Sequence, residues 1–130
     1  MQGGIRMTAL AETITALRPV VPAADYAAAK AFYRTLGFVF SHEAEDISIA
    51  RMGDFSFALQ NFDPPGFAEN FVVHLLVSDV AAWWDVIDAL DLAARHGVRP
   101  PLAPKAMPWG ATVVFLFDPS GVMWQISQFG

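Results

Sequence analysis

The chain has 130 residues, a length that suits one compact domain. Hydrophobic residues make up 55% of it and charged residues 16%, which excludes an intrinsically disordered chain. There is no cysteine, so disulfides, thiolate metal centres and thiol nucleophiles are excluded. The net charge is −5 and no basic block occurs, so we expect no nucleic-acid partner.

The first twelve residues carry neither a clear apolar period nor the pattern of a signal peptide. Gly3-Gly4 and a second methionine at Met7 predict a flexible leader over residues 1–12. No apolar run reaches the roughly 18 residues that a membrane-spanning segment needs. We therefore expect a cytoplasmic protein with no membrane partner.

The first half of the chain reads as a strand, a helix and three further strands. The apolar run Ile14–Val21 predicts the first strand, which ends at Pro22. Asp25 is placed to cap a helix, and Gly37 to end it. The apolar positions of that helix are Tyr26, Ala29, Phe32, Tyr33 and Leu36. Three strands follow, with a tight turn at Gly53-Asp54, over Phe38–Glu43, Ile47–Met52 and Phe55–Phe62.

The second half repeats this order. A strand over Phe71–Val77 precedes a helix that Asp79 caps and Gly97 ends. The apolar positions of that helix are Trp83, Ile87, Leu90 and Ala94. A turn at Asp118–Gly121 separates the last two of three final strands, predicted near Leu102–Met107, Ala111–Phe117 and Val122–Phe129.

The two capping aspartates, Asp25 and Asp79, are 54 positions apart, which indicates an internal duplication. We predict an α+β fold, one domain over residues 13–130, built of two βαβββ modules at about 13–63 and 70–130. Several strands are apolar on both faces, so the two sheets are expected to curl around a shared cavity with the helices outside. Small residues at Ser56 and Ala58 leave room in that cavity.

Three segments resemble one known family. Asp25, Ala29, Phe32-Tyr33 and Leu36-Gly37-Phe38 resemble the first helix of the vicinal oxygen chelate superfamily, which includes glyoxalases, bleomycin resistance proteins and dioxygenases. Asp118-Pro119-Ser120-Gly121 before an apolar strand is similar to the end of that family's fold, and Pro108-Trp109-Gly110 to its bleomycin-resistance branch. The resemblance covers about residues 14 to 129. It implies paired βαβββ modules, a homodimer and a small-molecule ligand.

Catalytic members of this family chelate one divalent cation with His and Glu side chains. The matching places here fall at Arg18, Gln60 or its neighbour Ala58, Val73 or His74, and Gln125. Arginine carries a permanent positive charge and glutamine none, so neither is a good metal ligand. We therefore predict no metal, no cofactor and no catalytic residue.

The predicted ligand-binding residues are those at the matching places together with the tryptophan of the bleomycin-resistance motif: Arg18, Gln60, His74, Trp109 and Gln125. Arginine can pair with an anion or stack on a ring, and glutamine gives directional hydrogen bonds. Each also has a structural alternative: Arg18 as the partner of a nearby carboxylate, and Trp109 and His74 as packing residues. If Gln125 faces the cavity, Trp124 belongs to the core. The negative net charge favours a cationic ligand at long range.

Three functions stay open at this point. The preferred one is a metal-independent protein that binds an antibiotic or aromatic compound and acts by sequestration, similar to bleomycin resistance proteins. The second is an enzyme, a metal-dependent lyase, isomerase or dioxygenase of the glyoxalase superfamily. The third is a duplicated scaffold used as an interaction or dimer module.

Overall fold

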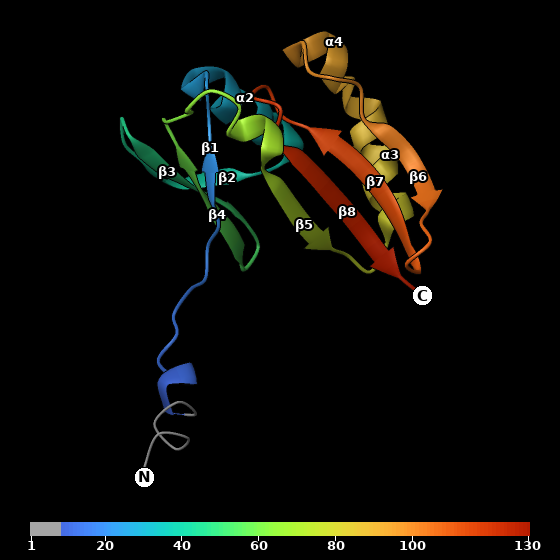
Figure 1. Cartoon of the computed structure of the whole chain (residues 1–130), viewed down its shortest axis with the longest axis horizontal. Helices are drawn as coiled ribbons and strands as arrows, with labels where there is room; N and C mark the ends of the chain where they lie inside the picture. Colours follow the sequence, from blue (N-terminus) through green and yellow to red (C-terminus); the bar gives the residue numbers. More distant parts are fainter. Residues whose placement is uncertain (1–8) are drawn as a thin grey trace.

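A computed structural model describes residues 9–130, and residues 1–8 of the predicted leader lie outside the described part. Residues 9–130 form two four-stranded sheets, which lie beside one another with the segment before β1 extending away from them (Figure 1). The strand order of the first sheet is β1-β4-β3-β2. Its strands are β1 (Val20–Pro22), β2 (Val39–Glu43), β3 (Ile47–Met52) and β4 (Phe55–Gln60).

The second sheet has the order β5-β8-β7-β6. Its strands are β5 (Val72–Leu76), β6 (Leu102–Ala106), β7 (Ala111–Phe117) and β8 (Met123–Phe129). In both sheets the first strand pairs in parallel with the last, and the other neighbours are antiparallel. The α+β architecture of two βαβββ modules predicted from the sequence is therefore confirmed.

The helix of the first module, α2 (Tyr26–Leu36), begins and ends at the predicted residues. The Asp25 carboxylate accepts a hydrogen bond of 3.0 Å from the Ala28 amide. Gly37 ends the helix with a φ of 114°, a conformation that L side chains rarely adopt. These two residues fix the position of the strand that follows.

The first strand is shorter than predicted, because Ile14–Pro19 is not part of it. Only Val20–Pro22 pairs with β4, at Ala58, Leu59 and Gln60. Along this register, residues 14–16 would lie beyond Phe55, where β4 begins. Pro19 has no amide hydrogen to donate to the ladder, and only its carbonyl is used, as the acceptor of the Ala58 amide. Ile14 and Leu17 are consequently exposed at 68% and 91%.

The helix of the second module is broken where the sequence predicted a continuous one. α3 (Val80–Leu90) ends at Asp91, which adopts a left-handed conformation with φ 51° and ψ 51°, and a short α4 (Leu92–His96) follows. The change of direction leaves Leu92 only 1% exposed. Burial of this leucine is the physical gain that accompanies the break.

The core between the modules contains an aromatic cluster of Tyr33, Phe38, Phe57 and Trp124. The ring centroids of Tyr33 and Phe57 are 4.9 Å apart, and those of Phe57 and Trp124 are 5.3 Å apart. Three of these rings come from the first module and the fourth from β8, so one core serves both modules. Within residues 9–130, no helix combines the length and the apolar character needed to cross a bilayer.

Candidate functional site

A cavity of about 520 Å³ lies where the two modules meet. Its walls are the segment at 15–19, the turn between β3 and β4, the strand β5 and two tryptophans, Trp83 of α3 and Trp124 of β8. Small-molecule sites in proteins commonly have volumes of about 300–1,000 Å³ and mostly apolar walls. The cavity is therefore large enough for a small organic molecule.

Three polar residues of the cavity lie in one row across the first sheet. Ser56 of β4 pairs with Arg51 of β3 in the antiparallel register, so both side chains point to the same face. On the other side of β4, the Arg18 Nε donates a hydrogen bond of 2.8 Å to the Ser56 Oγ. The row places Arg18 and Arg51 on opposite sides of Ser56.

The charges that line the cavity differ in sign from the charge of the whole chain. Arg18 and Arg51 line it together with His74, whereas Asp54 is the acidic residue of the lining. Among residues 9–130, no carboxylate lies within 4.0 Å of either arginine. The net charge of −5 thus does not describe the surface that a ligand in this cavity would meet.

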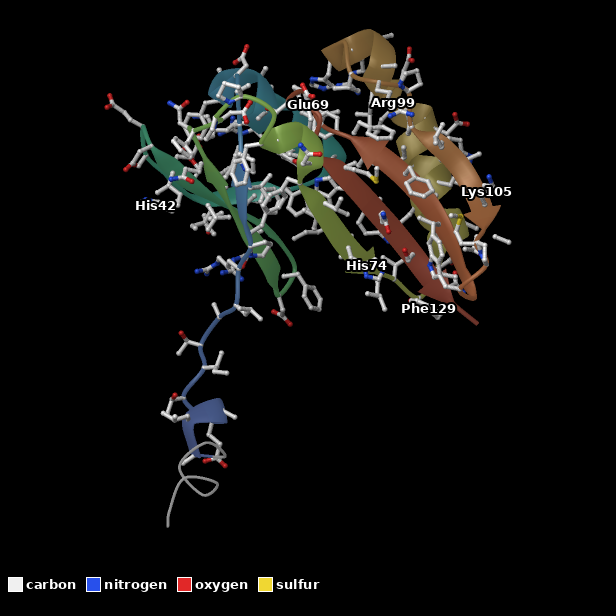
Figure 2. The ribbon with its side chains drawn as sticks, viewed as in Figure 1. His42, Glu69, His74, Arg99, Lys105 and Phe129 are labelled. Atoms are coloured by element: carbon white, nitrogen blue, oxygen red, sulfur yellow. The ribbon has the colours of Figure 1, made fainter. Side chains whose placement is uncertain are left out.

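Of the predicted site residues, Arg18 and His74 both line the cavity. His74 lies on β5 directly beside Gln125 of β8 in the parallel register, so the two share one face of the second sheet. The His74 ring is 6.5 Å from the ring of Phe129, and both residues lie along the lower side of this sheet in Figure 2. Gln125 is half-buried and does not line the cavity.

The two remaining predicted residues lie elsewhere. Gln60 is at the end of β4, paired with Ile47 and Pro22, and is half-buried outside the cavity. Trp109 lies in the turn between β6 and β7 with 55% of its surface exposed. Arg18 and His74 thus line the same cavity, whereas Gln60, Gln125 and Trp109 lie outside it.

Sequence reasoning placed Ser56 on the cavity face but missed Arg51 and Trp83 as residues of the cavity wall. A signal for Arg51 was available, because a tight turn at Gly53-Asp54 makes Arg51 and Ser56 neighbours on one face. Trp83 gave no such signal, because an apolar residue at helical spacing normally belongs to the core. It is half-buried here.

One cavity wall is held by a buried hydrogen-bonded chain. The Trp124 indole donates to the Tyr33 hydroxyl at 3.0 Å, and Tyr33 donates to the Asp118 carboxylate at 2.7 Å. Burial raises the pKa of Tyr33 and also raises the pKa of Asp118, whose partners oppose the shift. The backbone amides of Ser120 and Val122 also donate to this carboxylate. These groups fix the Trp124 ring and lie outside the cavity.

The side chains at the site do not fit a divalent cation. Such an ion requires several imidazole, carboxylate or thiolate ligands at one point. Across the described range 9–130, no three His, Cys, Asp or Glu side chains gather closely enough to hold one. Arg18, Gln60, His74 and Gln125 do not gather at one point either, because only Arg18 and His74 line the cavity, so these side chains do not form a metal site.

Comparison with known proteins places this geometry in a family. A bleomycin resistance protein from Klebsiella pneumoniae is 28% identical over 114 residues, which cover 85% of this chain and 89% of the relative. The crystal structure of a bleomycin-binding protein complexed with bleomycin has a TM-score of 0.77 at 25% identity. It covers 90% of this chain and 100% of that chain.

Enzymes also share the fold. A lactoylglutathione lyase from Agrobacterium tumefaciens has a TM-score of 0.65 at 18% identity, covering 88% of this chain and 94% of that one. Architecture alone therefore does not separate binders from enzymes. The family model for the glyoxalase/bleomycin resistance protein/dioxygenase superfamily matches residues 15–126, and the chain belongs to that superfamily.

Proposed function

We propose that this protein binds a planar small organic molecule, an antibiotic or another aromatic compound, without a metal, and acts by sequestering it. The cavity of about 520 Å³ between the modules is the observation that carries this proposal. Phe55 and Trp83 line it and offer ring faces for stacking, Trp124 forms part of its buried wall, and Arg18 and His74 supply polar contacts. The relatives named for bleomycin resistance and bleomycin binding support the same function.

Metal independence rests on the chemistry of the side chains. A lyase, isomerase or dioxygenase of this superfamily would need a set of His and Glu ligands, and the described residues bring no such set together. No observation in the described part of the chain favours the enzyme over the binder. Binding should therefore be equal before and after treatment with a chelator.

Sequestration is tested by recovering the ligand. The purified protein is screened by thermal shift against planar aromatic compounds, bleomycin included, because a ligand that binds only the folded state raises its apparent stability. Each compound that binds is then recovered after long incubation and weighed by mass spectrometry. An unchanged mass and a stoichiometric complex support the proposal. Chemical conversion of the compound, or affinity that appears only with added metal, contradicts it.

A pair of tryptophan variants tests whether the cavity is the site. Trp83→Leu removes an aromatic wall of the cavity, whereas Trp109→Leu makes the same change in the exposed turn before β7. We expect Trp83→Leu to weaken binding by about tenfold, because stacking contributes roughly 1 kcal/mol or more. Trp109→Leu should leave binding nearly unchanged. The reverse order would move the site to the turn and contradict a site in the cavity.

We also propose that the chain is a homodimer. Apolar residues outside the cavity lining are exposed on the sheets, including Val39 at 68%, Phe129 at 50% and Leu102 at 46%. A second copy of the chain would remove such residues from water. Light scattering after gel filtration should give twice the mass of 14.2 kDa, and Val39→Asp should shift it toward the monomer. A monomer at all concentrations contradicts this.

The expected cytoplasmic location stays a prediction, which cell fractionation checks.

A further inference from the structure

We propose that the cavity selects an aromatic anion, a planar ring system whose carboxylate or phenolate group is held between Arg18 and Arg51. This inference rests on the proposed function and adds the charge class of the ligand. It reverses the expectation from net charge, which favours a cation.

The first observation is the row that Arg51, Ser56 and Arg18 form across the first sheet. Arg51 pairs directly with Ser56, and the Ala58 amide donates to the Pro19 carbonyl at 2.9 Å, which sets Arg18 beside Ser56 on the opposite side of β4. Neighbouring strands are about 4.8 Å apart, so the backbones of the two arginines are about 10 Å apart across β4. Two long side chains can converge across this span on one anionic group in front of Ser56.

The second observation is that neither Arg18 nor Arg51 has an ionic partner among the described residues. Elsewhere in the described chain, Lys30 and Arg34 pair with Glu43 at 3.4 and 2.6 Å. Arg95, Arg99 and Lys105 likewise have no carboxylate within 4.0 Å among the described residues, but they do not line the cavity. Arg18 and Arg51 are half-buried, carry permanent charge and have no carboxylate within 4.0 Å in the described residues. Two like charges on one face repel each other, and an anion between them removes that repulsion.

The aromatic half of the ligand follows from the other walls. Phe55 follows the Gly53-Asp54 turn, at the rim of the cavity, and keeps 75% of its surface exposed, and Trp83 is half-buried on the opposite module. A planar ring between these side chains would cover apolar surface that is otherwise in contact with water. The anionic group and the ring body are thus recognised by different parts of the cavity.

The distance of each charge from a bound ligand determines whether the cavity arginines or the net charge of the chain has the larger effect on which ligand binds. One acidic residue, Asp54, belongs to the cavity lining, where two arginines outnumber it. The other acidic residues lie outside the lining, and interactions beyond about 8 Å are largely screened at physiological ionic strength. A group inside the cavity contacts the arginines directly, in a partly dehydrated place where charge-assisted hydrogen bonds are strongest. The local arginines therefore outweigh the net charge of −5 in the choice of ligand.

Three probes with one ring body test this selection. 2-Naphthoate, 2-naphthamide and 2-naphthylmethylammonium carry a negative, neutral and positive group on the same naphthalene. Calorimetry should show naphthoate binding at least about tenfold more tightly than naphthamide, and the ammonium compound most weakly. The affinity for naphthoate should fall as salt is added.

Substitutions of Arg18 and Arg51 test whether these two arginines cause the preference for naphthoate. Arg18→Gln and Arg51→Gln should each weaken naphthoate about tenfold and leave naphthamide nearly unchanged. Arg99→Gln is the matched control, because it removes the same charge from a residue stacked on Phe117 at 4.2 Å, at the other end of the second sheet from His74 (Figure 2). This control should leave all three affinities unchanged.

The possible results separate the inference from the function on which it rests. Equal or tighter binding of the amide or the ammonium compound overturns the anion preference while the binding function stands. An equal loss in Arg99→Gln and in the two cavity variants also overturns it, because the effect would then be one of overall charge. If none of the probes and none of the screened compounds binds, both the inference and the binding function fail.

Discussion

At the scale of single residues, the Tyr33 hydroxyl joins the two modules more directly than any apolar contact. It belongs to α2, yet it accepts from Trp124 of β8 and donates to Asp118 in the turn before that strand. All three groups are buried. Leaving such groups without partners is costly in a low-dielectric interior, so the hydroxyl should contribute to stability out of proportion to its size.

We predict that Tyr33→Phe lowers the free energy of unfolding by about 1–3 kcal/mol, the cost of leaving buried polar groups unpaired. Urea denaturation followed by tryptophan fluorescence measures the change. Thr13→Val is the control, because the Thr13 hydroxyl donates to the Leu10 carbonyl on the exposed segment before β1. The network would be unimportant if the two variants lost the same stability.

His96 provides a pH-dependent contribution. Its Nε2 lies 2.9 Å from the Thr35 Oγ1, and burial, with a smaller effect of the neighbouring Arg95 charge, lowers the pKa of His96 from 6.5. The folded state thus favours the neutral ring. This contribution is fully present above pH 6.5 and is lost as the pH falls from there through the lower folded pKa.

We predict that His96→Gln flattens the decline in stability as the pH falls below 6.5, because the glutamine does not titrate. Denaturation midpoints across this window measure the slope. His42→Gln changes an exposed histidine of β2 and is the control. The assignment fails if the His96 variant keeps the slope of the unmodified protein.

At the scale of elements, glycines at the ends of strands and helices decide how the hairpins connect. Gly37 and Gly53 both have positive φ, at 114° and 60°. Around Gly53 there is open space, whereas a Cβ on Gly37 would lie 3.4 Å from the Met52 side chain. Only the conformation at Gly53 is one that asparagine tolerates.

We predict that Gly37→Ala lowers the unfolding free energy by about 1–3 kcal/mol through backbone strain. Gly53→Asn should cost less than about 1 kcal/mol, because single asparagines adopt the left-handed region. Thermal and urea unfolding of the two variants compare the costs directly. Equal losses would show that backbone conformation at Gly37 is not the cause.

At the scale of the whole molecule, the duplicated modules are not independent units. The aromatic cluster takes Tyr33, Phe38 and Phe57 from the first module and Trp124 from the second. The Ser120 hydroxyl also accepts a hydrogen bond of 2.9 Å from the Ala24 amide, across the same junction. Each module alone would expose this surface to water.

We predict one cooperative unfolding transition for the full chain, with coincident midpoints by fluorescence and far-ultraviolet circular dichroism. Fragments divided after Gly66 should not fold alone, because each keeps only part of the shared core and is below the size at which a core is usually sufficient. A cooperative transition in either isolated fragment would contradict a shared core.

The sequence by itself determined the elements and their duplication. Asp25, Gly37 and Asp79 are local signals, and a cap or a left-handed glycine acts within a few residues of its own position. The alternation along the last strand likewise indicated that Trp124 and Gln125 face opposite ways, but it left open which of them faces the cavity. Trp124 is 3% exposed and borders the cavity, whereas Gln125 does not line it. Such features can be predicted from the sequence because short-range geometry is fixed by neighbours in the chain.

Only the tertiary structure decided which side chains meet. Arg51 and Trp83 reach the cavity from different modules, and no local pattern relates two residues so far apart in the chain. The short length of β1 and the helix break at Asp91 could not be predicted from the sequence either. Pairing and burial depend on what the rest of the fold presents at each place. Val20–Pro22 is the part of the predicted first strand that pairs with β4, and the interior has room for Leu92, which is 1% exposed.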